Sequence, residues 1–241
     1  MKYTKELIGL INIGIVIMMN KYLVVAFILV LIFIILSAIV SPKLNLANHH
    51  NLLSPIVKYD NSLLNQMIKS HMQWLNQFMI FMTQYGREAV LPIFIILIAA
   101  FGGQEGRKTA AVMSLSILVL IPISMIVKDI VARPRPDQQI SSLLPSDNEY
   151  SFPSGHATIV SAGAATALVL FRTKNRIIIS IALAAEAAIV CISRVYLGHH
   201  FPLDVVGGVL LGVGVSFMLV GVSDKIEKAM LMLTRKLSIK P

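Results

Sequence analysis

Residues 22–40 read YLVVAFILVLIFIILSAIV, a stretch that contains no charged side chain. A helix needs about 20 predominantly apolar residues to cross the hydrocarbon layer of a bilayer, and this run approaches that length. The stretch therefore predicts a transmembrane helix and sets the class of the chain.

Working outward, similar apolar runs recur along the sequence, at residues 89–103, 109–127, 154–171, 177–192 and 202–222. The first of these, at 89–103, is expected to extend backwards past Arg87, which would lie at the interface. Of the 241 residues, 56% are hydrophobic and 14% are charged, whereas a soluble domain carries about 25% charged residues. We expect one domain over residues 1–241, an all-α polytopic membrane bundle of about six transmembrane helices. Cys191 is the only cysteine, which excludes an intrachain disulfide.

Residues 42–84, between the first two runs, are polar enough to leave the membrane. Apolar side chains recur there at helical spacing, at Leu64, Met67, Ile68, Leu75, Phe78 and Met79. This pattern predicts an outer helix between the first two spans, which either lies in the membrane interface with Trp74 at headgroup depth or packs on the ends of the bundle.

The net charge is +9. The basic residues lie between the spans rather than in one stripe, which indicates membrane orientation and not nucleic-acid binding. Most of them fall on the side that carries both termini, and cytoplasmic loops are enriched in Lys and Arg. The protein is therefore expected in the cell membrane, with both termini cytoplasmic and the polar clusters described next on the extracytoplasmic face.

The first polar cluster follows the run at 109–127 and comprises Lys128 and Arg135-Pro136. Prolines 134 and 136 stiffen the loop, and Lys and Arg are the residues that bind phosphate oxygens. The alternative is a set of cations that merely flanks a span. Arg133 is a further cation that could equally face lipid headgroups.

The second cluster, Pro153-Ser154-Gly155-His156, opens the run at 154–171. Ser154 is expected to cap a helix whose free amide groups attract anions, and Gly155 allows a ligand to approach the backbone. His156 then lies in the first turn. The alternative is that the tetrapeptide only starts the helix.

The third cluster is Ser193-Arg194, followed by His200 and Asp204. A carboxylate four residues after a histidine can accept the proton of one ring nitrogen and leave the other free for attack. Asp204 could instead only favour the helix dipole. His199 competes with His200 but is one residue out of register.

The three clusters carry three cations and one carboxylate, a charge that a phosphomonoester of about −1.5 to −2 would balance. Together they read K-x6-R-P, P-S-G-H and S-R-x5-H-x3-D. This pattern resembles the signature of the type 2 phosphatidic acid phosphatase family, whose superfamily includes vanadium-dependent haloperoxidases and bacterial acid phosphatases. About six spans with an outward-facing site resemble its bacterial membrane branch.

The resemblance implies a role for each residue. His200 would attack phosphorus, Asp204 would orient it, and His156 would protonate the leaving oxygen. The remaining signature residues would bind the phosphate: Lys128, Arg135, Ser154, Gly155 and Arg194. It also implies no metal and no cofactor.

We therefore expect a membrane lipid phosphatase whose partners are a lipid phosphate substrate and membrane lipids, with no nucleic acid and no obligate protein partner. By resemblance, the candidate substrates are undecaprenyl diphosphate, phosphatidylglycerol phosphate, phosphatidic acid and diacylglycerol pyrophosphate. The alternatives are a lipid phosphotransferase and a non-enzymatic anion or lipid transporter. For Glu186, in the middle of a span, three alternatives stay open: it is protonated, it bonds to a neighbouring helix, or it contacts substrate.

Overall fold

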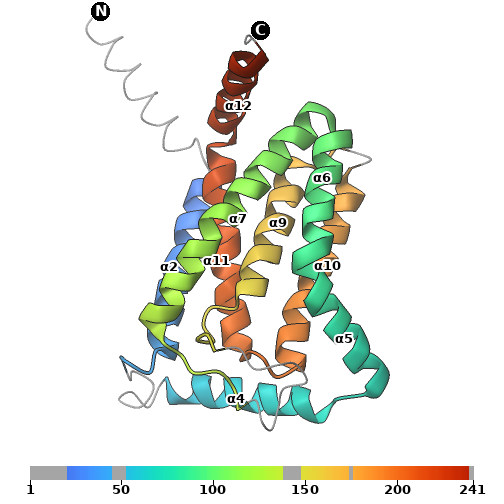
Figure 1. The fold of residues 1–241 in the computed structure, drawn as a ribbon. Coiled ribbons are helices and arrows are strands. Elements are labelled where there is room, and N and C mark those ends of the chain that lie inside the picture. Colours follow the sequence, from blue (N-terminus) through green and yellow to red (C-terminus); the bar gives the residue numbers. More distant parts are fainter. Residues whose placement is uncertain (1–20, 45–52, 138–147, 174–175, 239–241) are drawn as a thin grey trace, which may run out of the picture.

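The computed structural model describes residues 21–44, 53–137, 148–173 and 176–238, and the regular structure within these ranges is helical. The long helices run side by side as a bundle (Figure 1). The predicted all-α membrane bundle is confirmed.

Five helical stretches of the described chain are long and apolar enough to cross a membrane. They are α2 (Lys21–Val40), Gln73–Phe101, α7 (Gly103–Val131), α10 (Ile177–Tyr196) and α11 (Pro202–Gly221). The sixth predicted span is α9 (Gly155–Leu170), which is apolar but has only 16 residues. The number of spans therefore stays a prediction.

The second span begins earlier than its apolar run at 89–103. Its helix is built from α5 (Gln73–Tyr85), the π-helical turn η1 (Gly86–Val90) and α6 (Leu91–Phe101). Arg87 and Glu88 interrupt the apolar pattern, but they form an ion pair with each other and do not interrupt the helix. The wide turn brings Gly86 against α10, where a Cβ atom would lie 2.5 Å from Oε1 of Glu186.

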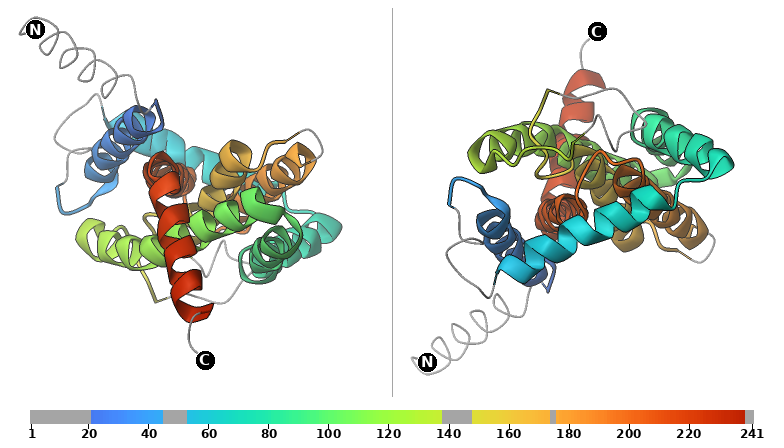
Figure 2. Two further views of the ribbon diagram at one scale, coloured as in Figure 1. Left: turned by 90° about the horizontal axis from the view of Figure 1, so that it is seen from above. Right: turned by 90° about the horizontal axis from the view of Figure 1, so that it is seen from below.

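Residues 42–84 differ from the prediction of one amphipathic helix, because the chain turns at residues 70–72. The part before the turn is α4 (Ser54–Lys69), and the part after it, with Trp74, is α5. The turn is held at Tyr196, whose carbonyl oxygen lies 2.6 Å from Nε2 of His71. Helix α4 lies across the ends of the other helices (Figure 1 and the right view of Figure 2), and it buries Leu64 and Asp60 there.

The centre of the bundle is the contact between α9 and α11, two helices rich in small residues. A Cβ atom on Gly212 would lie 2.2 Å from the carbonyl oxygen of Thr158, and one on Gly208 would lie 2.6 Å from that of Ser154. Only glycine allows this approach, because a real Cβ atom needs more than 3 Å. The amide of Ser154 consequently reaches the carbonyl oxygen of Asp204 at 3.0 Å, which joins the starts of the two helices.

Helix α12 (Ser223–Ser238) projects from one end of the bundle, and α4 lies at the other end (Figure 1). Lys108 of α7 forms ion pairs with Asp224 and Glu227 at the start of α12. The bond from Lys108 lowers the pKa of the Asp224 carboxyl group below its ordinary value. A hydrogen bond from Gln104, together with the bond from Lys108, lowers the pKa of the Glu227 carboxyl group.

Candidate active site

The three polar clusters all lie at the end of the bundle that α4 crosses. Lys128 belongs to the last turn of α7, and Arg135 follows in the loop after it. Arg194 belongs to the last turn of α10, His156 to the first turn of α9, and Asp204 to the first turn of α11. The fold thus assembles helix ends that are distant in sequence, as the clusters predicted.

His200 lies in the short connection between α10 and α11 and is 2% exposed. Its Nδ1 atom is 3.5 Å from Oδ2 of Asp204 and 3.4 Å from Oγ of Ser151. Its Nε2 atom is 3.4 Å from Nη1 of Arg135. One ring nitrogen therefore faces a carboxylate, and the other faces a cation that can hold an anion.

The carboxylate of Asp204 is buried and fixed through both oxygens. Oδ2 accepts hydrogen bonds from the hydroxyl of Ser151 and, at 2.9 Å, from the amide of Phe201. Oδ1 accepts one from Nη1 of Arg133 at 2.6 Å. Since the amide of Phe201 precedes α11, Asp204 caps this helix and faces His200 at the same time.

Two guanidinium groups converge on His199. Its Nδ1 atom lies 3.2 Å from Nη2 of Arg194 and 3.4 Å from Nη1 of Arg135. Arg135 also donates to the carbonyl oxygen of His199 at 3.2 Å, and Arg194 donates to the hydroxyl of Thr83 at 2.8 Å. His199 thus lies between the two predicted phosphate-binding arginines, a position that suits holding them in place.

Lys128 is buried, and its ammonium group forms an ion pair with the carboxylate of Glu149. Arg135 donates from Nε to the carbonyl oxygen of the same residue at 2.9 Å. Glu149 therefore links the two cations of the first cluster.

The start of α9 differs from the prediction in one respect. Ser154 occupies the N-cap position, but its side chain makes no capping bond, and its buried hydroxyl has no hydrogen-bond partner among the residues that the structure describes. Beside it, no described atom beyond the immediate chain lies within 4 Å of where a Cβ atom of Gly155 would be. An unpartnered hydroxyl next to open space at a helix N-terminus suits an anion better than it suits a cap.

The surroundings of His200 favour its neutral form. Burial holds the pKa of this histidine well below its ordinary value of 6.5, and the positive charges of Arg194, Arg135 and Lys128 lower it further. A neutral imidazole keeps a lone pair on one ring nitrogen, which is what a nucleophile requires.

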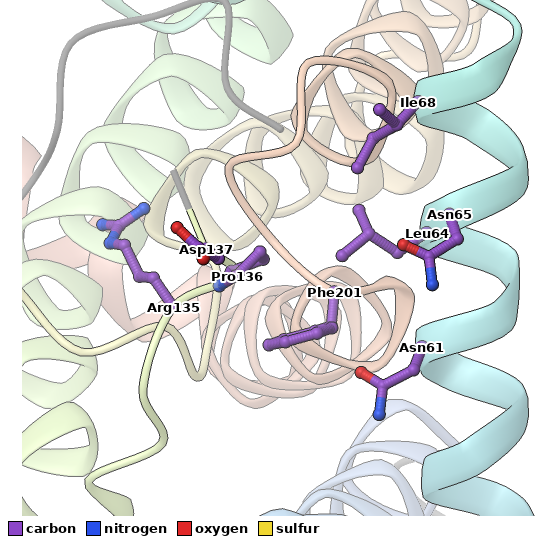
Figure 3. Close-up of a pocket in the computed structure, with 8 residues that line it drawn as sticks. All are labelled: Asn61, Leu64, Asn65, Ile68, Arg135, Pro136, Asp137 and Phe201. Carbon is purple, nitrogen blue, oxygen red and sulfur yellow. The ribbon is translucent and has the colours of Figure 1, made fainter. Parts of the chain in front are cut away.

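A pocket of about 300 Å³ adjoins these residues (Figure 3). Asn61, Asn65, Leu64 and Ile68 of α4 form one wall, the segment Arg135-Pro136-Asp137 forms the other, and Phe201 lies between them. The pocket is an open space beside Arg135 and Phe201, the residue that follows His200, and this space could receive a polar group.

The structure adds site residues that no sequence pattern indicated, namely Asp60, Thr83, Glu149 and Ser151. It also corrects one alternative, because Arg133 is buried, bonds to Asp60 and Asp204 and does not face headgroups. A lone acidic residue in an amphipathic helix gave no signal that could have identified Asp60.

Comparisons with known proteins point to one superfamily. The sequence model of the PAP2 superfamily matches residues 109–228. An undecaprenyl-diphosphatase of Sulfolobus acidocaldarius is 38% identical over 62% of this chain and 71% of its own length. Phosphatidylglycerophosphatase B of Bacillus subtilis is 35% identical over 64% of this chain and 78% of its own length.

Among solved structures, a transmembrane PAP2-type phosphatidylglycerolphosphate phosphatase from Bacillus subtilis superposes with a TM-score of 0.63 at 28% identity. The match covers 83% of this chain and 96% of that one. The sequence motifs, the multi-pass helical fold and these relatives together show that the chain belongs to the PAP2 superfamily.

Proposed function

We propose that this PAP2 lipid phosphatase hydrolyses lipid phosphomonoesters or diphosphates through a phosphohistidine on His200. The observation that carries the proposal is the placement of a buried imidazole between the carboxylate of Asp204 and the guanidinium of Arg135.

In the first step, Nε2 of His200 forms a bond to phosphorus while the bond from phosphorus to the leaving oxygen breaks. His156 gives that oxygen a proton, and Asp204 stabilises the positive charge that develops on the ring of His200. In the second step, water attacks phosphorus, His156 takes its proton, and the bond between phosphorus and nitrogen breaks to release phosphate.

Phosphoryl transfer needs mainly positioning and stabilisation of charge on the phosphoryl oxygens. Lys128, Arg135 and Arg194 supply positive charge around His200. The hydroxyl of Ser154 and the amide of Gly155 supply further donors beside the open space at α9.

Because three cations already supply this charge, we propose that the reaction needs no metal ion. Phosphate release should continue in EDTA, and vanadate, which mimics five-coordinate phosphorus, should inhibit it. Loss of activity in EDTA that Mg²⁺ restores would contradict a metal-free reaction.

The relatives suggest which lipids to test, since two of them are named for undecaprenyl diphosphate and phosphatidylglycerophosphate. Purified protein should be assayed for phosphate release from these two lipids, from phosphatidic acid and from diacylglycerol pyrophosphate. We expect at least one to be turned over, and release from none would reject the proposed activity.

We further propose that the site faces the outer leaflet and that both termini are cytoplasmic. Basic residues gather around α12 and the neighbouring loops, at the end of the bundle opposite to α4: Arg107, Lys108, Arg172, Arg176, Lys225 and Lys228. They support this orientation, because cytoplasmic loops are enriched in Lys and Arg. A protease-cleavable tag at the C-terminus should resist protease added to intact cells. Cleavage of the tag would show that the protein has the opposite orientation.

A further inference from the structure

Arg133 bridges two carboxylates that are more than a hundred residues apart in the chain. Its Nη1 atom donates to Oδ1 of Asp204 at 2.6 Å, and its Nη2 atom donates to Oδ2 of Asp60 at 2.5 Å. The guanidinium also lies over the ring of Phe201, 4.1 Å from its centroid. All three charged residues are buried, with exposed fractions of 1% for Asp60, 6% for Arg133 and 0% for Asp204.

Asp60 bonds to the start of α11 as well as to Arg133. Its Oδ1 atom accepts a hydrogen bond from the amide of Leu203 in the first turn of α11, at 2.8 Å. Burial raises the pKa of Asp60 above its ordinary value, while the charge of Arg133 opposes that rise. Arg133 therefore favours the charged form of this carboxylate, and the carboxylate in turn fixes one end of the guanidinium group.

Because of this bridge, the two oxygens of the Asp204 carboxylate have different partners. Because Arg133 occupies Oδ1, the other oxygen faces Ser151, the amide of Phe201 and Nδ1 of His200. Without Arg133 the carboxylate could rotate about its terminal torsion, which is broad and roughly two-fold for Asp.

We propose that Asp60 and Arg133 are positioning residues for the Asp204–His200 pair, so that helix α4 sets the orientation of the nucleophile. This inference rests on the proposed function, since it assumes that His200 attacks phosphorus. It gives α4 a part in the reaction beyond packing on the end of the bundle.

The test compares five proteins in detergent with dioctanoyl phosphatidic acid as the probe: the wild type, Asp60→Asn, Arg133→Gln, Arg133→Lys and Asp60→Asn/Arg133→Gln. If the wild type does not hydrolyse this probe, it is replaced by any lipid phosphate that the wild type does hydrolyse in the substrate screen. Asp129→Asn is the matched control, because it makes the same change at an exposed residue of the α7 terminus. Each protein is assayed well below its own Tm, so that loss of folded protein does not enter kcat.

We expect kcat to fall about 10-fold in Asp60→Asn and about 100-fold in Arg133→Gln, by analogy with the losses seen when groups that orient metal ligands are removed. KM should change little, because neither residue belongs to the phosphate-binding set. Arg133→Lys should also be slow, since a single ammonium group cannot hold two carboxylates as a planar fork does. This variant keeps the charge and serves if the neutral variant does not fold.

The double variant separates positioning from stability. A purely structural pair would leave kcat normal in every variant that is folded at the assay temperature, and in particular in the double variant, which leaves neither member of the pair unpaired. Normal kcat in folded Asp60→Asn, Arg133→Lys or the double variant overturns the inference, while wild-type activity through His200 would still stand. Absence of wild-type turnover on every lipid phosphate would instead remove the proposed function.

Discussion

The carboxylate of Glu149 forms an ion pair with the ammonium group of Lys128, although the glutamate side chain is 60% exposed and the lysine side chain only 9%. The carboxylate of Glu149 thus pairs, from the solvent side, with a cation that we propose to bind the substrate phosphate. An anionic substrate must displace it or bind alongside it.

Glu149→Gln should therefore lower KM without lowering kcat. The expected gain is about two- to fivefold, because a half-exposed ion pair contributes roughly 0.5–1 kcal/mol. Steady-state kinetics with a lipid phosphate measures it. Glu227→Gln, which removes a carboxylate from Lys108 at the opposite end of the bundle, should leave KM unchanged. An increased KM in Glu149→Gln would mean that Glu149 helps to bind substrate.

Gly212→Ala should destabilise the protein, because the added methyl group would lie 2.2 Å from the carbonyl oxygen of Thr158 and 2.4 Å from Oγ of Ser161. Overpacking of this kind costs about 1–3 kcal/mol. Thermal unfolding in detergent should show a lower Tm, and an unchanged Tm would mean that α9 and α11 separate easily.

Gly155→Ala makes the same chemical change where the structure has open space. We expect a Tm close to that of the wild type but weaker inhibition by vanadate and a higher KM, because the methyl group enters the space proposed for the phosphoryl oxygens. Unchanged vanadate inhibition would place the anion elsewhere.

The low pKa of His200 makes a prediction for acid conditions. Folded protein keeps this histidine neutral below its ordinary pKa of 6.5, so the proposed nucleophile remains available there. With p-nitrophenyl phosphate, whose leaving group needs no proton from His156, kcat should not decline with an apparent pKa near 6.5. A decline centred at that value that remains after substrate ionisation is accounted for would show that His200 titrates normally.

The same group affects stability in a defined direction. Because the unfolded chain binds a proton near pH 6.5 and the folded protein does not, the contribution of His200 to the free energy of unfolding is full above that pH. It is lost as the pH falls from about 6.5 towards the lower pKa of the folded state. The free energy of unfolding should be measured by chemical unfolding of the wild type and of His200→Gln over this range. It should fall more with decreasing pH in the wild type than in His200→Gln, because the variant lacks the imidazole.

Much of the fold and of the candidate site could be predicted from the sequence, because both depend on local signals. Uncharged runs locate helices, and Lys128, His156, Arg194 and Asp204 stand out as charged or titratable groups at the ends of such runs. The apolar run alone placed the start of the second span only roughly, but its expected extension past Arg87 is seen, with Arg87 and Glu88 paired inside a continuous helix.

The remaining features depend on tertiary contacts. No periodicity could show that α4 would turn at residues 70–72 and lay Asp60 beside Arg133, because that contact joins residues 73 positions apart. Glu186 is a similar case. It lies against Gly86, yet neither of its carboxylate oxygens has a hydrogen-bond partner among the described residues, so a bond to a neighbouring helix, one of the alternatives for this residue, is not seen.

The central claim is that His200 carries the phosphoryl group during turnover. Protein mixed with a lipid phosphate that is ³²P-labelled at its terminal phosphate should be quenched in base within one turnover and mapped by mass spectrometry. We predict a label on residue 200 that is stable in base and labile in acid, and that is missing from His200→Ala. A label on another residue, or phosphate release by folded His200→Ala at the wild-type rate, would contradict the account.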